Sequence, residues 1–521
     1  MRTPYLRRAV AGALVIAAVS VGAFVVAQGL ANGFEGFWGR KYASPAAAHR
    51  NGVSAGASGL ADAARRARPA PANARARLVH WNQIAVDASG VDHTPVVEGE
   101  RRVFGEQLGP GRASLAIATV HIAIADAVNA IYGRWQSFTS LPPAPNSTSV
   151  DAAIAQAAHD TLIAMFPSQA PALDIALAED LVQITAKGKE EGIALGRRAA
   201  AAILSKRVAD GSDARDPRMG LDFHSSDEPG KWRQDPISLI PVALGASWGY
   251  VKPLVLQSGS QFRSLPPPAI HTREYAQAYN EAKRLGGDGV ITPTERTAEQ
   301  TAIGIFWAYD GTPSLCAPPR LYNQVILTVA DQMHTDFLDL TRLLALANVA
   351  MADAGIAIWE SKFFYQLWRP VTAIREADEG TGPTGHGDGN PGTEGDPTFT
   401  PLGAPASNLA GPDFTPPFPT YPSGHAGFGG ALFEVLRRFY GRDDVAFTFM
   451  SDELNGTTRG QDGQLRPAQP RHFTSFSQAE EENGQSRIYL GIHWSFDKTE
   501  GIAQGRRVAE YVMQNAFTAR R

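Results

Sequence analysis

The chain has 521 residues, of which 44 % are hydrophobic, so it can bury a large core, and its length suggests more than one domain. Its formal net charge of −4 gives no sign of a nucleic-acid partner. The single cysteine, Cys316, excludes an intrachain disulfide, and the sequence contains neither a Cys/His zinc spacing nor a phosphate-binding Gly-x-x-x-x-Gly-Lys loop.

Residues 1–31 have the features of an export segment. Three arginines precede an almost uninterrupted apolar run over residues 9–31, which ends in small residues suited to signal cleavage. The run is also just long enough to span a bilayer. We therefore expect export to the periplasm or the extracellular space, either with cleavage, which we favour, or with residues 9–31 kept as an N-terminal membrane anchor.

The next segment, residues 32–78, is rich in Ala, Gly, Pro and Arg. It shows no sustained apolar period, so we expect a flexible linker. Globular character begins at residue 79.

Apolar residues at helical spacing recur before and after a loop-rich stretch over residues 210–268, and few stretches alternate as a strand does. We therefore expect an all-α fold, with a first helical bundle over residues 79–290. Polar residues inside the first apolar helix are expected to be satisfied within the bundle rather than catalytic. The expected helices are Ser114–Tyr132, Asp151–Phe166, two within Ala172–Val208 that break at Lys187-Gly188, and Thr272–Leu285.

Residues 291–521 are expected to form a second helical bundle. Thr292-Pro-Thr-Glu295 has the pattern of a capped helix start, and that helix is expected to continue through Trp307. Two further helices are expected within Phe337–Trp368, and the last helices within Phe476–Phe517. The Gly/Asp-rich stretch 380–397 carries oxygen ligands that suit calcium but matches no EF-hand spacing, so we favour a solvated loop.

The centre of the second half is the turn Tyr421-Pro-Ser-Gly-His425, which is followed by an apolar run to Tyr440. A Pro-Ser-Gly turn that opens a helix makes an anion site, because first-turn N–H groups lack internal partners and the helix dipole adds positive charge. Gly424 allows close approach to the backbone. Ser423 offers a hydroxyl, and His425 exchanges a proton near neutral pH.

Two flanking stretches add charge to this turn. Lys362 and Arg369 are seven residues apart, about two helical turns, so we expect them on one helix face. Downstream, Arg487 precedes His493 and Asp497, whose spacing lets the carboxylate hold one imidazole nitrogen and leave the other basic. Three cations and two histidines beside a helix N-terminus suit a tetrahedral oxyanion. The alternative is that the three cations only form surface ion pairs.

The three motifs are Lys-x6-Arg-Pro, Pro-Ser-Gly-His and Ser-Arg-x5-His-x3-Asp. Together they resemble the signature shared by the vanadium haloperoxidases and the type 2 phosphatidic acid phosphatases. The resemblance covers about residues 79–515 and is strongest over 300–500. It implies two packed helical bundles with long loops, and a cofactor site in the C-terminal bundle.

Residues just outside the signature favour the haloperoxidase branch. Trp359 lies three residues before Lys362, and Phe418 lies five residues before Ser423. The strings around them resemble the vanadium chloroperoxidases, in which the matching Trp and Phe line the halide side of the cofactor. The alternative is that both are ordinary core aromatics.

The resemblance implies one vanadate per chain, with His493 as its only protein ligand and His425 as the general base toward hydrogen peroxide. Lys362 would polarise the bound oxidant. The other residues implied to hold the cofactor oxygens are Arg369, Ser423, Gly424 and Arg487. Asp310 is implied to pair with Arg487, and Asp497 to orient His493. The implied partners are hydrogen peroxide, a halide and a small organic acceptor.

Two other functions fit the same residues. In an acid phosphatase, His493 would attack phosphorus to form a phosphohistidine, and His425 would protonate the leaving alkoxide. In a membrane-tethered binding module, the anion site would remain without catalysis. The intact signature favours an enzyme.

Overall fold

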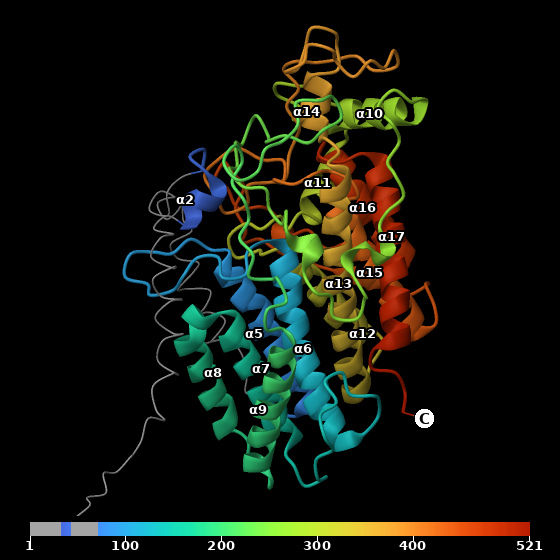
Figure 1. Cartoon of the computed structure of the whole chain (residues 1–521). Coiled ribbons are helices and arrows are strands. Elements are labelled where there is room, and N and C mark those ends of the chain that lie inside the picture. The colour runs from blue at the N-terminus through green and yellow to red at the C-terminus, as the bar shows by residue number, and fades with distance from the viewer. Residues whose placement is uncertain (1–32, 43–70, 521) are drawn as a thin grey trace, which may run out of the picture.

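The computed structural model describes residues 33–42 and 71–520. Over these residues the chain is mainly helical with long loops, and the sheet it contains is one antiparallel pair. The pair joins β1 (Phe447–Phe449) to β2 (Arg471–Phe473), with Thr448 opposite His472. The expected all-α class is confirmed (Figure 1).

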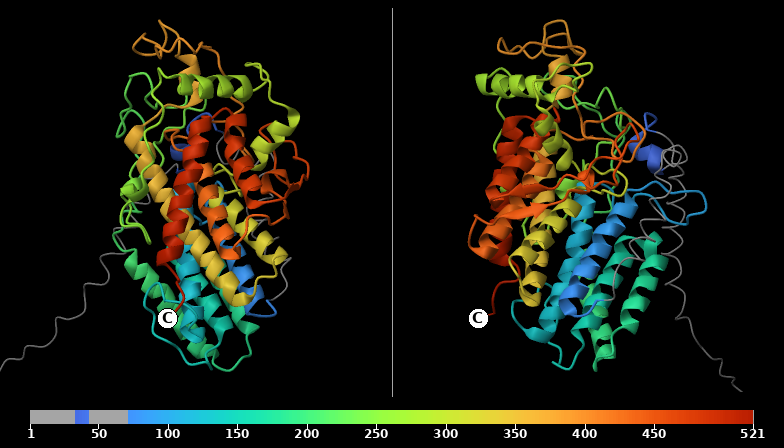
Figure 2. Two further views of the ribbon diagram at one scale, coloured as in Figure 1. Left: turned by 90° about the vertical axis from the view of Figure 1, so that its right-hand side faces the viewer. Right: turned by 180° about the vertical axis from the view of Figure 1, so that it is seen from behind.

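The first group of helices lies side by side in all views (Figures 1 and 2). Its members are α5 (Ala74–Asp92), α6 (Gly109–Tyr132), α7 (Val150–Met165), α8 (Ala170–Val182) and α9 (Lys189–Lys206). The expected break before α9 is present, because Gly188 adopts the left-handed conformation. The polar residues of α6 have structural partners, as expected: His121 donates to Asn82, and Asp126 accepts from the backbone of Phe138.

The second group lies beside the first and carries the predicted signature. It consists of α11 (Ala298–Phe306), α12 (Pro318–Gln332), α13 (Phe337–Tyr365), α15 (Gly424–Tyr440), α16 (Phe476–Tyr489) and α17 (Ser495–Asn515). The helices α10 (Arg273–Gly286) and α14 (Pro370–Arg375) lie at one end, beneath the loop that follows α14 (Figure 1). Single 3-10 turns are η2 (Pro167–Gln169), η3 (Trp248–Tyr250), η4 (Gly259–Phe262) and η5 (Asp452–Leu454).

Helix α13 joins the two groups. It packs against α6 of the first group and against α15 and α17 of the second, and its buried side chains belong to one continuous hydrophobic core. We expected two helices in this region, and that was wrong. The segment is apolar all round because it is covered from both sides, so no polar face marks a turn. Gly355 lies within the helix and leaves room for the ring of Phe428.

The expected linker over residues 32–78 is wrong at both ends. Helix α2 (Gly33–Trp38) is ordered, and Phe34, Trp38 and Tyr42 are buried. At the other end Asn73 caps α5, accepting from the N–H of Ala76. The average composition of residues 32–78 does not reveal the short aromatic cluster at the start of this segment, which can pack against the hydrophobic core. Residues 43–70 and the expected export segment lie outside the described residues.

The expected helix start at Thr292 is also wrong. Helix α11 begins five residues later, where Thr297 and Gln300 make both hydrogen bonds of a capping box. The hydroxyl of Thr292 accepts instead from the backbone of Thr400 at 2.8 Å. The helix ends at Phe306, before Trp307. The sequence contains two possible N-caps for this helix, Thr292 and Thr297. In the structure Thr297 is the N-cap.

Two helices of the described chain, α6 and α13, are long and apolar enough to cross a membrane by length and composition. A third span results if the bent pair Val150–Met165 and Pro167–Val182 is counted as one. The most apolar stretches of α6 and α13 are 100 % and 94 % buried inside the protein, so these apolar side chains form part of the core.

The middle of α13 is tied to the preceding loop by a buried carboxylate. Asp353 accepts the backbone N–H groups of Leu254, Val255 and Leu256 at 2.6–2.8 Å. Burial raises the pKa of Asp353, and the three donors oppose that rise. The loop therefore depends on this one side chain.

We predict that Asp353→Ala lowers the free energy of unfolding by about 3 kcal/mol, because it leaves three backbone donors without an acceptor. Asp339→Ala is the matched control, since Asp339 is exposed in the first turn of the same helix, and we expect a loss of about 0.5 kcal/mol. Urea denaturation of both variants measures the difference. Equal losses would contradict the role of Asp353.

Candidate active site

The helix start predicted at the Pro-Ser-Gly turn, called the anion socket below, is present. Ser423 is the N-cap of α15, and its hydroxyl accepts from the N–H of Ala426 at 3.4 Å. The next residue, Gly424, lies against Trp359 and Lys362, because a Cβ there would be 3.3 Å from the indole ring. The first-turn N–H groups of α15 therefore lie beside a lysine, in a place where a Cβ would make a tight contact with Trp359.

Lys362 and Arg369 meet at this socket, but not on one helix face as expected. Helix α13 ends at Tyr365, Gln366 takes a left-handed conformation with φ 53°, and Arg369 is the extended N-cap of α14. The two side chains converge because the same loop holds both. Lys362 Nζ donates to the carbonyls of Pro419 and Thr420 at 2.9 and 2.8 Å. Arg369 Nε donates to the carbonyl of Phe418 at 3.0 Å.

Neither of these cations has an acidic partner. Burial, and then the charge of Arg369, holds the pKa of Lys362 well below its ordinary value, although Asp497 opposes the shift. Burial lowers the pKa of Arg369 to about 9. Backbone carbonyls satisfy their donors but supply only partial charge. The pocket therefore favours an added anion.

Arg487 has an acidic partner and still has free donors. Its Nη2 donates to both oxygens of Asp310 at 2.7 and 2.9 Å, the pairing that was expected. Its Nε and Nη1 are buried and have no hydrogen-bond partner among the described residues. A buried guanidinium with two unpaired N–H groups fits the oxygens of vanadate or phosphate. This observation shows that the residues present suit the implied cofactor.

His493 is held with Nε2 unprotonated and facing Arg369. Its Nδ1 donates to Asp497 at 2.8 Å, and Thr420 also contacts that carboxylate. Its Nε2 faces Arg369 Nη1 at 3.0 Å. Burial, and then Arg369, holds the pKa of His493 well below its ordinary value, so the ring is neutral. A neutral imidazole with Nε2 unprotonated is the form that ligates.

His425 is oriented in the opposite sense. Its Nε2 donates to the carbonyl of Ala308, which can only accept, so Nδ1 is the unprotonated nitrogen. That Nδ1 lies 4.0 Å from Asp310. Burial, and then Arg487, holds the pKa of His425 well below its ordinary value. The carbonyl of His425 accepts from Tyr322 and Asn483, which fixes the first turn of α15.

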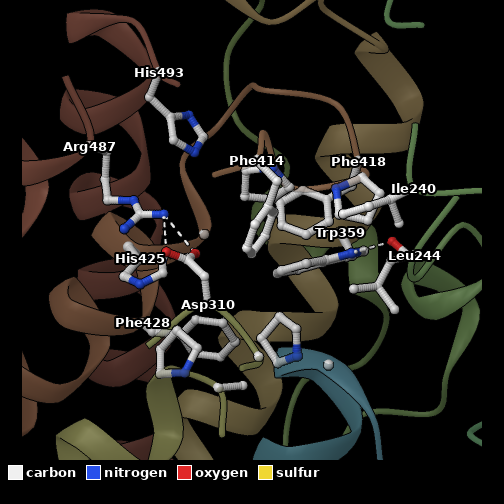
Figure 3. A pocket seen from close by; sticks show the side chains of 18 of the residues that line it. Ile240, Leu244, Asp310, Trp359, Phe414, Phe418, His425, Phe428, Arg487 and His493 are labelled. Atoms are coloured by element: carbon white, nitrogen blue, oxygen red, sulfur yellow. Dashed lines mark hydrogen bonds and ion pairs between the residues drawn. The ribbon is translucent and has the colours of Figure 1, made fainter. Parts of the chain in front are cut away.

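Aromatic rings form the other wall. The ring centroids of Trp359 and Phe418 are 4.9 Å apart. Lys362 Nζ and Arg369 Cζ each lie 5.0 Å from the centroid of Phe418, so this ring faces two cations. In Figure 3 the rings of Trp359, Phe414 and Phe418 lie on one side of the pocket, and His493, Arg487, His425 and Asp310 lie on the other.

The cavity between these walls has a volume of about 40 Å³, room for about three water-sized molecules. It extends beyond the expected residues to Ile240, Leu244, Phe414 and the side chains of Phe37 and Trp38 on α2. Sequence reasoning missed these residues, as it missed Thr420, Tyr322 and Asn483. Only Thr420 carried a usable signal, because it lies three residues before Ser423.

A divalent cation has no comparable site in the described chain. No group of three His, Cys, Asp or Glu side chains could hold a metal ion within residues 33–42 and 71–520. In the loop 380–397, Asp388 accepts from Asn390 and Thr393, and Asp396 accepts from Thr398. These carboxylates accept hydrogen bonds from neighbouring residues.

Comparisons with known proteins agree with this geometry. Residues 342–520 match the family model described as "VCPO second helical-bundle domain". The chain is 32 % identical to the vanadium chloroperoxidase of Curvularia inaequalis, over 81 % of this chain and 78 % of that protein. A bacterial vanadium-dependent iodoperoxidase superposes with a TM-score of 0.67 at 22 % identity, covering 87 % of this chain and 100 % of the other. A holo-type bacterial vanadium-dependent chloroperoxidase gives 0.56 at 17 % identity, covering 80 % and 94 %.

We predict that Asp310→Ala weakens the binding of orthovanadate about 10- to 100-fold, because Arg487 loses the carboxylate that holds its guanidinium. Equilibrium dialysis of the purified protein measures this affinity. Asp396→Ala is the control and should retain the affinity of the wild type. An unchanged affinity in Asp310→Ala would show that Arg487 needs no partner.

Proposed function

The chain belongs to the vanadium haloperoxidase family, a group of peroxide-dependent oxidoreductases with vanadate as cofactor, and we propose that its own pocket oxidises chloride and bromide. The observation that carries the proposal is the pair of unpaired donors on buried Arg487, beside two further buried cations. A trivalent or divalent oxyanion neutralises this charge, whereas a neutral substrate does not.

We assign the cofactor contacts to the residues that converge on the socket. His493 Nε2 is the ligand atom, because Asp497 and Thr420 occupy the other side of the ring. The oxygens of the cofactor are held by Lys362, Arg369, Ser423, the N–H of Gly424, and Arg487. Bound vanadate supplies a Lewis acid that activates hydrogen peroxide toward halide without changing its own oxidation state.

The proton chemistry belongs to His425. Its Nδ1 is unprotonated, since Nε2 donates to Ala308, so Nδ1 takes a proton from hydrogen peroxide as that molecule enters the pocket. The same atom would then return the proton to the oxygen that is released when the O–O bond of the peroxide breaks, and Asp310, 4.0 Å away, would stabilise the imidazolium in the interval. Lys362 would polarise the peroxide oxygen that the halide attacks. No residue of the chain needs to change its oxidation state.

The aromatic wall supports halide oxidation over phosphate-ester hydrolysis. Trp359 and Phe418 close one side of the pocket, and with about 40 Å³ of cavity they leave space for a small ion. Cations over the face of Phe418 keep the potential positive where an anion approaches. The organic acceptor reacts with the hypohalous acid that leaves the pocket.

We further propose that the protein is exported and that cleavage after Ala31 removes the leader. Helix α2 begins at Gly33, so cleavage at that point leaves α2 intact. N-terminal sequencing of the protein from its native host tests this. A chain that keeps residues 9–31 and partitions with membranes would be the anchored form instead.

The function is tested with the purified protein, freed of vanadate and then loaded with orthovanadate. We expect vanadate-dependent halogenation of monochlorodimedone by hydrogen peroxide with chloride and with bromide. Hydrolysis of p-nitrophenyl phosphate by the vanadate-free protein is measured in parallel. Rapid hydrolysis that vanadate only inhibits, with no halogenation, would identify a phosphatase that proceeds through phospho-His493.

We predict that His493→Ala and His425→Ala separate binding from chemistry. His493→Ala loses the ligand atom, so both vanadate retention and halide oxidation are lost. His425→Ala keeps vanadate but loses about 100-fold or more in halide oxidation, because the general base is absent. Vanadate content and turnover of the dialysed variants are compared. Full activity in His425→Ala would assign the base elsewhere.

We predict that Phe418→His shifts preference from chloride toward bromide. The substitution replaces an apolar ring beside Lys362 and Arg369 with an imidazole, which can form hydrogen bonds. The two neighbouring cations keep this imidazole neutral. The ratio of chloride to bromide turnover measures the shift. Phe364→His is the control, because Phe364 is an exposed ring outside the pocket. Phe399→His is not used, because Phe399 is buried. Equal ratios in both variants would remove Phe418 from the halide site.

A further inference from the structure

Trp38, one of the residues that line the pocket, has a buried unpaired donor that the proposed mechanism does not use. Among the described lining residues, the buried side-chain atoms without a hydrogen-bond partner are Arg487 Nε, Arg487 Nη1 and Trp38 Nε1. Trp38 is 1 % exposed, so water does not satisfy its N–H from bulk solvent. A buried N–H without a partner costs about 1–3 kcal/mol, which a ligand at that place recovers.

Trp38 is held in place by packing rather than by its nitrogen. Its ring lies 5.1 Å from Phe414 and 5.0 Å from Tyr42, centroid to centroid. The hydroxyl of Tyr42 donates to the carbonyl of Pro412 at 3.0 Å. Gly411 is required beside it, since a Cβ there would be 2.4 Å from the Tyr42 ring. The indole is therefore fixed in the wall with its donor free.

The other indole of the wall has its donor occupied. Trp359 Nε1 donates to the carbonyl of Leu244 at 3.0 Å (Figure 3). Trp359 thus offers the halide an aromatic surface but no hydrogen bond. Phe414 and Phe418 have no donor at all. In the apolar half of the described pocket, Trp38 is the side chain with an N–H to give.

Charge and size identify what this donor binds. Lys362 and Arg369 each lie 5.0 Å from the ring of Phe418 in the pocket wall, and Arg487 lines the same pocket, so buried cationic side chains surround it. A cavity of about 40 Å³ suits a monatomic anion better than an organic acceptor. An N–H within an aromatic wall is a good donor for a weakly hydrated anion, because it loses little solvation and gains a charge-assisted hydrogen bond.

We propose that Trp38, contributed by the N-terminal helix α2, is a halide-binding residue whose indole N–H donates to the halide in the apolar half of the pocket. This inference rests on the proposed haloperoxidase function and adds a residue to it. It also gives α2 a role, since the segment that follows the leader completes the halide site.

Trp38→Phe tests the donor while keeping an aromatic ring. We expect the KM for bromide to rise about tenfold, or about 1.4 kcal/mol, with kcat and vanadate content unchanged. The rise should be larger for chloride and smaller for iodide, because the hydrogen bond weakens as the ion grows. Trp135→Phe is the matched control: Trp135 Nε1 is also buried and unpaired, but Trp135 does not line the pocket.

A change in the KM of the organic acceptor alone, or equal effects of Trp38→Phe and Trp135→Phe, would overturn the proposal. Thermal melting of both variants identifies any loss of fold. If Trp38→Phe unfolds, Trp38→His is used instead, since it keeps an N–H donor, and a bromide KM close to that of the wild type supports the proposal.

Bromide located by anomalous scattering in crystals of the vanadate-loaded protein gives a readout independent of turnover. A bromide within hydrogen-bonding distance of Trp38 Nε1, absent in Trp38→Phe crystals, supports the proposal. A bromide found only elsewhere in the pocket overturns it. If the wild type oxidises no halide, the proposed function fails, and the bromide position still decides whether Trp38 binds the ion.

Discussion

Buried positive charge without enough buried negative charge is the constraint on which this structure depends. Lys362, Arg369 and Arg487 are almost fully buried, and within the described part of the chain Arg487 alone of the three has an ion pair, with Asp310. Asp497 and Asp235 attract Arg369 without forming an ion pair with it. Leaving such charge uncompensated costs several kcal/mol. The lowered pKa values of Lys362 and Arg369 express that cost, and an oxyanion in the pocket opposes both shifts. The protein is thus built to be completed by an anion, which is why the same pocket chemistry serves vanadate and phosphate.

The scaffold meets this cost by surrounding the cations with rigid elements. Helix α13 is buried along its length and delivers Lys362 at its C-terminal end, while the loop 416–420 supplies the carbonyls that hold Lys362 and Arg369. Helices α15 and α17 pack closely against each other, and their N-terminal turns present Gly424 and Asp497. The functional groups therefore come from several segments that are far apart in the sequence. Such preorganisation lowers the cost of ordering at the moment of reaction.

The sequence predicted the residues of the site correctly where a motif defines them. It did not predict how the backbone brings distant segments together. The motif around Ser423 predicted the helix start at the anion site, and the family resemblance implied the pairing of Asp310 with Arg487. The shared face of Lys362 and Arg369 was inferred from helical spacing, but the structure brings them together across a helix end. Helix α2 was missed because four aromatic residues in an Ala/Gly-rich segment show no period. Its contacts with Phe414 lie hundreds of residues away in the chain, so no local pattern signals them.

The most direct measurement is the thermal stability of the vanadate-free protein as orthovanadate is added. An anion that neutralises the buried cations binds the folded state alone, so Tm should rise with the logarithm of vanadate concentration. At 100 times Kd the free energy of unfolding should increase by about 2.7 kcal/mol. In Arg487→Ala the rise should be largely lost, since the unpaired donors are removed. If the wild-type Tm does not respond to vanadate or phosphate, the pocket does not need an anion, and the account of its charge is contradicted.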